Sequence, residues 1–127
     1  MPNLHLLPGT KPLSLDDLIA ATDDGILIYG DSSYSIDHQR YNFQFSGQVF
    51  YEVRHGKVAG MLKDVAYQAN TQEFWNACDA ICDERSFELG GTYYCGKNQP
   101  MQSSSVSHGC SPARFRRVNI LNTRRQV

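Results

Sequence analysis

The side chains of this sequence best suited to bind a metal or to act as nucleophiles are its four cysteines and four histidines: Cys78, Cys82, Cys95, Cys110, His5, His38, His55 and His108. Their spacing matches no C-x2-C zinc module and no H-E-x-x-H helix, and the chain has no phosphate-binding glycine loop. Packed free thiols are the usual state of cysteines in a reducing compartment. We therefore expect no disulfide framework.

Cys95 has the surroundings of a reactive thiol. It ends an expected strand and is followed by Gly96, which lets a ligand approach the backbone closely. Lys97 carries a positive charge that favours the thiolate, the form that attacks or binds a metal. A catalytic cysteine also needs a base, and no cysteine–histidine–asparagine order is present. From spacing alone, a packed structural thiol is therefore the favoured interpretation, and a functional Cys95 is the alternative.

Two histidines have positions typical of exposed loops. His55 falls in an expected hairpin turn with Gly56, so we expect its side chain to be solvated. His108 lies two residues before Cys110 and could share a metal with it, but a histidine in a surface loop is the favoured interpretation.

Length and charge limit the classes of function open to the chain. Its 127 residues and mass of 14.3 kDa indicate a single domain over residues 1–127. The net charge of −1 argues against a nucleic-acid partner, although residues 1–88 carry −7 and residues 89–127 carry +6. We expect the basic segment to pair with the acidic one or with a partner.

No apolar run reaches the ~20 residues of a membrane helix, and no secretory pattern is present, so we expect a cytoplasmic location and no membrane partner.

An amphipathic helix is expected near the N-terminus. Ser14 and Asp17 have the spacing of a capping box, which satisfies backbone N–H groups at the start of a helix. Gly25 is expected to end this helix, and the apolar run Ile26–Tyr29 then predicts a buried strand.

A second amphipathic helix is expected over Thr71–Asp83, with Asn70 or Thr71 as its N-cap. Its apolar face would consist of Phe74, Trp75, Cys78, Ile81 and Cys82. Cys78 and Cys82 are therefore expected to be shielded from solvent.

The clearest strand pattern lies in the middle of the chain. Apolar and polar residues alternate from Tyr41 to Val53 with a slip at Gly47, and Lys57–Tyr67 returns as the antiparallel partner. Further strands are expected at Leu4–Leu7, Thr92–Cys95, Met101–Val106 and Arg114–Leu121, with a Gly96-Lys97 turn and a frayed tail over 122–127. This order indicates an α+β fold built mainly from antiparallel sheet with two helices, and it leaves open whether the sheet curves into a barrel.

Several short segments, in a fixed order over nearly the whole chain, carry a family pattern. They are Asn3–Gly9, Leu15–Ile19, Asp24–Ile26, Phe43–Ser46, Val53–Val58, Cys95–Gln99 and Val106–Pro112. The Asn-x-x-x-x-Pro-Gly and Cys-Gly-Lys pieces are the most specific. Together the segments resemble the C-terminal part of the TldD/PmbA family of zinc metallopeptidases, whose members are also described as modulators of DNA gyrase.

The resemblance implies that Cys95 is the third protein ligand of a zinc ion. In active family members the other two ligands are histidines of an H-E-x-x-x-H helix, whose glutamate is the general base, and this sequence contains no such helix. Three protein ligands leave one position for water. The resemblance also implies flexible peptide substrates held in extended form, with this domain supplying part of the peptide-binding sheet. We therefore expect a chain that is inactive alone, has no catalytic residue of its own and holds no zinc in isolation.

The sequence departs from the family pattern near Cys95. Tyr93 and Tyr94 stand where the family is shorter, Gln99–Met101 replaces a Gly-Gln pair, and Cys110 enters a Gly-x-Pro turn.

The alternative function is a non-enzymatic module that binds a peptide or a partner, including the gyrase-modulator type. Expected partners are a peptide substrate and either a second copy in a homo-oligomer or a family partner subunit. Among the thiols, Cys95 is expected to be exposed and the most reactive, with Cys110 its nearest competitor.

Overall fold

The computed structural model describes residues 1–124. The helical elements are α1 (Leu15–Ala20), α2 (Thr71–Asn76) and the 3-10 turn η1 (Glu84–Ser86). The strands are β1 (Leu4–His5), β2 (Asp24–Tyr29), β3 (Tyr34–Ile36), β4 (Asn42–Ser46), β5 (Val49–Arg54), β6 (Lys57–Leu62), β7 (Val65–Asn70), β8 (Cys78–Ile81), β9 (Glu88–Lys97), β10 (Gln102–Cys110), β11 (Ala113–Phe115) and β12 (Asn119–Asn122). No helix in this part of the chain has the length and apolar character needed to cross a membrane.

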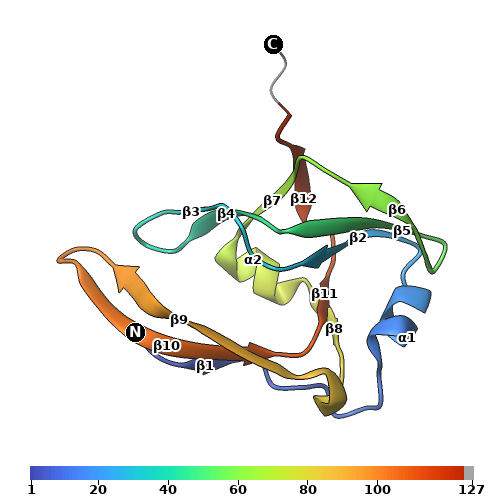
Figure 1. Ribbon diagram of the computed structural model, residues 1–127, viewed down its shortest axis with the longest axis horizontal. Coiled ribbons are helices and arrows are strands. Elements are labelled where there is room, and N and C mark those ends of the chain that lie inside the picture. The colour runs from blue at the N-terminus through green and yellow to red at the C-terminus, as the bar shows by residue number, and fades with distance from the viewer. Residues whose placement is uncertain (125–127) are drawn as a thin grey trace.

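The strands form four open sheets (Figure 1). Their orders are β1-β10-β9, β11-β8, β12-β7-β4-β3 and β2-β5-β6, and every pairing is antiparallel except that of β1 with β10. The expected α+β fold, mainly antiparallel with two helices, is confirmed. The barrel that the sequence left open does not form, because none of the sheets within residues 1–124 closes on itself.

The long central hairpin is confirmed, but it bends in the middle and contributes to two sheets. β5 pairs with β6, whereas β4 pairs with β7 in a different sheet. The break falls at Gly47, where an added Cβ would lie 2.5 Å from the Ile28 side chain of β2. Glycine therefore permits the close approach of β2 at the bend. The alternation does not predict the edge strand β3, because all three of its residues are exposed.

The first helix begins as the sequence predicts but ends earlier. The Ser14 side chain accepts a hydrogen bond from Asp17 N, and the Asp17 side chain accepts one from Ser14 N, which completes the capping box. The Ser14 hydroxyl and N–H hold the pKa of Asp17 below its usual range. α1 ends at Ala20, and Gly25 lies inside β2 because Asp24–Tyr29 pairs along its length with β5.

The second helix is much shorter than the sequence pattern predicts. Asn70 is its N-cap, as expected, but α2 ends at Asn76 and the following segment forms strand β8. β8 pairs with β11, which lies far later in the chain. Backbone hydrogen bonding to this distant strand overrides the local helical periodicity. Cys78 and Cys82 consequently do not share a helix face.

The expected last strand, Arg114–Leu121, is divided into two strands. Arg117, between β11 and β12, has a φ of +55°, which interrupts the extended backbone. β12 pairs with β7 along its whole length, and a backbone hydrogen bond follows at Thr123. The chain is therefore ordered beyond residue 122, and residues 125–127 of the expected frayed tail lie outside the described part.

Six aromatic rings join the sheet containing β4 and β7 to α2 and β11. They belong to Phe43, Phe45, Tyr67, Phe74, Trp75 and Phe115. Phe74 lies at the centre, stacked on Phe115 with ring centroids 3.9 Å apart and edge-on to Phe43 at 5.2 Å. Burial in this cluster raises the pKa of Tyr67. The cluster packs α2 firmly against the sheet.

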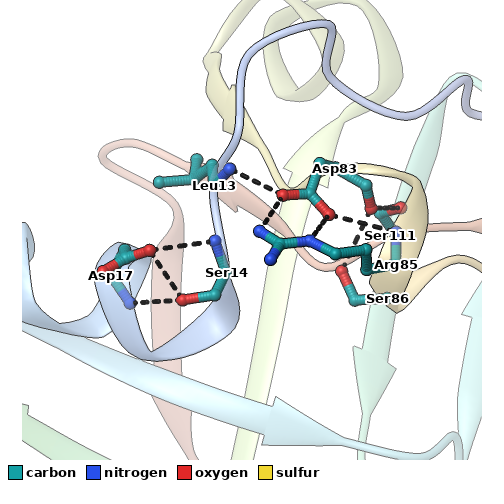
Figure 2. A network of polar contacts seen from close by, with 7 residues as sticks. All are labelled: Leu13, Ser14, Asp17, Asp83, Arg85, Ser86 and Ser111. Atoms are coloured by element: carbon teal, nitrogen blue, oxygen red, sulfur yellow. Dashed lines mark hydrogen bonds and ion pairs between the residues drawn. The ribbon is translucent and has the colours of Figure 1, made fainter.

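A buried carboxylate, Asp83, connects three segments beside α1 (Figure 2). Its oxygens accept hydrogen bonds from the Leu13 N–H at 2.7 Å and from the Arg85 guanidinium at 3.0 and 2.6 Å. These donors, Arg85 above all, hold the pKa of Asp83 well below its usual range. The buried Ser111 hydroxyl, just after β10, donates to the Asp83 carbonyl oxygen at 2.8 Å. The network thereby fixes the approach to α1 against the end of β10.

Part of the basic C-terminal segment pairs with the acidic segment, which is one of the two expected arrangements. Arg114 donates two hydrogen bonds to the Asp79 carboxylate, at 2.8 and 3.0 Å, and Arg116 contacts the same carboxylate. Arg114 also donates to Ala21 O at the end of α1, at 2.8 Å. These bonds connect β11 to β8 and to the first helix.

Candidate functional site

The candidate metal ligand Cys95 lies on a long two-stranded ribbon formed by β9 and β10 (Figure 1). Both strands are longer than the sequence predicts, and Gly96 and Lys97 belong to β9 rather than to a turn. The turn is formed by residues 98–101 instead. The Arg40 side chain donates to Gly96 O at 2.6 Å, and the Lys97 ammonium donates to His38 O at 3.3 Å. The end of the ribbon is therefore held against the loop before β4.

Cys95 is partly exposed, less than expected, and faces Ser104 across the ribbon. Side chains directly opposite each other in an antiparallel pair project from the same face, with Cβ atoms about 4.5–5.5 Å apart. The Ser104 hydroxyl oxygen is buried. Among the buried side-chain oxygen and nitrogen atoms of residues 1–124, it alone has no hydrogen-bond partner. An unused donor therefore lies next to the candidate ligand. Sequence reasoning missed Ser104, because the register that places it there depends on the fold.

The other three cysteines differ in exposure: Cys82 is buried, Cys78 is partly buried and Cys110 is exposed. The sequence predicts the shielding of Cys78 and Cys82 but places them on a helix that does not form there. Burial raises the pKa of both of these thiols. Both are therefore poor sources of thiolate. Cys110 is the most exposed of the four and lies at the end of β10 rather than in a turn. The higher reactivity expected of Cys95 stays a prediction, with Cys110 as a competitor of greater exposure.

His108 and His55, the two histidines considered above, each contact a group elsewhere in the fold. His108 lies in β10, not in a loop, and its Nδ1 is 3.2 Å from Leu4 O, so it supports the parallel pairing of β1. His55 is exposed in the turn between β5 and β6, as expected, and its Nδ1 lies 2.8 Å from the Asp23 carboxylate. Neither histidine belongs to a cluster of three or more metal-binding side chains within residues 1–124.

These donors fit only part of a zinc site. A catalytic zinc needs three protein ligands, and the described chain brings one partly exposed thiol together with an orphaned hydroxyl. The arrangement can contribute one soft ligand to a metal whose other ligands come from elsewhere.

Tyr93 and Tyr94, the pair that departs from the family pattern, form a β-bulge. Ser104 pairs with Cys95 and Val106 pairs with Thr92, so two residues of β9 stand opposite one residue of β10. The bulge accommodates the additional residue without disrupting the rest of the ribbon. Both tyrosines are strongly exposed, at 81% and 85%.

The fold and the site together define a β-rich domain with one candidate thiolate ligand and an incomplete donor set in its described part. A family model described as the PmbA/TldA metallopeptidase C-terminal domain matches residues 1–122, and the chain therefore belongs to this family.

Three archaeal relatives agree with this assignment. The chain is 28% identical over 123 residues to a metalloprotease of Methanothermobacter thermautotrophicus, covering 97% of this chain and 26% of the relative. It is 26% identical over 110 residues to metalloprotease MJ0996 of Methanocaldococcus jannaschii, covering 87% and 23%. It is 30% identical over 103 residues to a metalloprotease of Archaeoglobus fulgidus, covering 81% and 23%. The chain thus spans about a quarter of the length of the curated relatives it matches.

Proposed function

We propose that this chain acts as the C-terminal domain of a zinc metallopeptidase that cleaves flexible peptides. It supplies Cys95 as one metal ligand and part of the peptide-binding sheet, and it is inactive alone. The observation that carries the proposal is the position of Cys95 on the edge strand β9, inside the segment that matches the family.

The role of the chain at the metal is to hold one thiolate in place. β9 fixes the Cys95 backbone, and the Ser104 hydroxyl opposite is available to donate a hydrogen bond to the sulfur. Hydrogen bonds of this kind orient a metal ligand and tune it. When bound, zinc supplies a Lewis acid and lowers the pKa of a bound water. The histidines and the general base belong to the part of the enzyme outside this chain.

The role of the chain toward substrate is to offer a strand edge. β9 lies at the edge of the β1-β10-β9 sheet, with β10 as its one strand neighbour in the described residues. Edge strands usually carry charges, proline or bulges that discourage pairing. Residues 89–96 of β9 contain neither charge nor proline, although the strand has charged ends and the bulge at Tyr93–Tyr94. An extended peptide can pair with such an edge through main-chain hydrogen bonds.

The ligand role is tested in the complete metallopeptidase that carries this domain. Cys95→Ser is expected to remove most of the bound zinc and the peptidase activity, because the hydroxyl is a poor zinc ligand. Cys110→Ser is the matched control, since Cys110 is the more exposed thiol of the neighbouring strand. Equal zinc contents in the two variants, measured by elemental analysis, would contradict the assignment.

The isolated chain provides a second test. We expect no hydrolysis of unstructured peptides, with or without added zinc, because the described residues hold no complete metal site. Metal-dependent cleavage that persists through purification and disappears in Cys95→Ala would show that the chain is active alone.

The second candidate function is a non-enzymatic peptide- or partner-binding module. Two observations favour this module. The ribbon exposes side chains that could contact a peptide without any metal, and no group of three metal-binding side chains forms within residues 1–124. A complete protein that binds peptides without zinc and without hydrolysis would support this module. The gyrase-modulator variant has less support, since two of the basic side chains, Arg114 and Arg116, already bind Asp79.

A further inference from the structure

We propose that Tyr93 and the surface depression beside it form a side-chain subsite that selects extended peptides carrying an aromatic or large aliphatic residue. The inference rests on the proposed peptide-binding edge and adds a substrate preference to it. Three observations carry it: the bulge that places Tyr93, the shape of the depression, and its lack of charge.

The bulge gives Tyr93 an unusual position on an edge strand. A bulge turns side chains away from the regular alternation of the strand and is common next to binding sites. Here it leaves the rings of Tyr93 and Tyr94 almost fully in solvent, at 81% and 85% exposure. The Ser105 hydroxyl donates to Tyr93 O at 3.3 Å, which holds the bulged backbone in place. The ring is therefore presented outward from a fixed backbone.

The depression beside Tyr93 has a volume of about 490 Å³ and a floor of small residues. It is lined by Asn3, Gly91, Thr92, Tyr93, Ser105, Val106 and Ser107. Gly91 and Ser107 are cross-strand neighbours and share one face of the ribbon. A Cβ at Gly91 would collide with the Val106 carbonyl and lie 3.1 Å from the Ser107 Cα, so glycine is needed there and the floor stays low. The volume can accept one side chain of a bound peptide.

The Tyr93 ring is the part of the lining that favours an aromatic side chain. The other lining residues are Gly91, Val106 and the uncharged polar residues Asn3, Thr92, Ser105 and Ser107. None of the seven lining residues carries a charge, so a charged side chain would find no counterion. An aromatic side chain can instead pack on the Tyr93 ring. Aromatic pairs of this kind contribute roughly two- to tenfold in affinity.

The subsite lies near the candidate metal ligand along the strand but on the other face of the ribbon. Tyr93 is two residues before Cys95 on the same strand, and a strand advances ~3.3 Å per residue. Ser104 faces Cys95, whereas Ser105 and the Gly91–Ser107 pair line the depression, and alternate residues of a strand project to opposite faces. A peptide paired with β9 therefore reaches the depression with a side chain that alternates with those on the Cys95 face.

The test measures binding of two short fluorescein-labelled peptides to the whole 127-residue chain by fluorescence anisotropy. The peptides are unstructured and differ only in whether their central residue is Phe or Ser. We expect the Phe peptide to bind roughly two- to tenfold more tightly. Tyr93→Ala and the depression-filling Ser105→Leu are each expected to reduce this ratio to about one, while Tyr93→Phe retains it. The matched control is Tyr34→Ala, because Tyr34 is 75% exposed on a different sheet.

The outcomes separate the subsite from the function on which it rests. Equal binding of the two peptides, or loss of the preference in Tyr34→Ala as well, overturns the subsite and leaves the peptide-binding edge intact. No measurable binding of either peptide overturns both the subsite and the edge, while the zinc test of Cys95 still decides the ligand role. Circular dichroism shows whether each variant is folded. If Tyr93→Ala does not fold, the ratio of Phe-peptide to Ser-peptide binding in Ser105→Leu tests the subsite instead.

Discussion

At the residue scale, Gly9 lies where the N-terminal segment crosses the end of β8. Its N–H donates to Cys82 O at 2.9 Å, and an added Cβ would collide with the Ile81 carbonyl. The neighbour is backbone, which cannot move aside as a flexible side chain can. The glycine of the Asn-x-x-x-x-Pro-Gly segment thus has a packing reason, because it lets the chain approach β8 closely.

We predict that Gly9→Ala destabilises the chain by about 1–3 kcal/mol, the usual cost of overpacking. Gly60→Ala is the matched control, because a Cβ at Gly60 in β6 would meet no atom within 4 Å. Urea unfolding followed by circular dichroism measures both. A loss of stability in Gly60→Ala equal to that in Gly9→Ala would refute the packing explanation.

Two serines with buried hydroxyl groups, Ser104 and Ser111, should respond in opposite ways to removal of the hydroxyl. The Ser104 hydroxyl has no partner, so Ser104→Ala is expected to leave stability unchanged or to raise it by about 1 kcal/mol. The Ser111 hydroxyl donates to Asp83 O, so Ser111→Ala is expected to cost about 1–2 kcal/mol. Thermal or urea unfolding of both variants tests the contrast. A similar loss in both would mean that Ser104 has a partner in solution.

At the scale of elements, Asp83 links the approach to α1 with η1 and the end of β10. Its carboxylate has a lowered pKa because Arg85 and the Leu13 N–H stabilise the charged form. The folded state therefore binds fewer protons at this site than the unfolded state. The resulting stabilisation is complete above the unfolded aspartate pKa of about 3.9 and is lost as the pH falls through the lower folded pKa.

We therefore predict that the free energy of unfolding falls more steeply between about pH 5 and pH 2 in the wild type than in Asp83→Asn. The variant should also be less stable near neutral pH, because the amide loses the charge-assisted bonds from Arg85. Arg85→Gln, which removes the main cause of the lowered pKa, should flatten the same pH dependence. Parallel pH profiles for the wild type and Asp83→Asn would contradict the assignment.

At the scale of the whole molecule, β9 forms the outer edge of the β1-β10-β9 sheet (Figure 1), and nearly all of its residues are exposed. The exposed apolar side chains of the β9–β10 ribbon include Leu89, Tyr93, Tyr94 and Met101. By contrast, the aromatic residues of β4 and β5 are largely taken up by the core, where Phe43 and Phe50 are buried. The ribbon is therefore one exposed apolar surface available for association, and Val58 and Met61 of β6 are exposed on another part of the fold.

We predict that the isolated chain self-associates through the ribbon, because exposed apolar surface of this kind drives association. Sedimentation over an approximately hundredfold range of concentration should show a rising mean mass. The double variant Leu89→Glu with Met101→Glu should shift the equilibrium toward the monomer, while Met61→Glu, at an exposed methionine of β6, should not. A wild-type chain that remains monomeric over this range would disprove the prediction.

Much of the fold could be predicted from the sequence, because the features concerned depend on neighbouring residues. The capping box at Ser14, the N-cap at Asn70 and the turn at His55-Gly56 follow from local hydrogen bonding and backbone preferences. The alternation in β4 and β5 predicts strands with one buried face. The Cys-Gly-Lys segment likewise helped to indicate the family without any knowledge of the fold, while the role of Cys95 as a metal ligand stays a prediction.

Only the tertiary structure decided which distant segments meet. β8 is a strand because β11 pairs with it, although the local periodicity of Thr71–Asp83 is helical. The bulge at Tyr93–Tyr94 sets the register that puts Ser104 opposite Cys95 and exposes the tyrosines beside the depression. These outcomes depend on backbone pairing and side-chain packing between residues far apart in the chain. Such long-range free energies outweigh local propensities of a few tenths of a kcal/mol per residue, and a local pattern does not contain them.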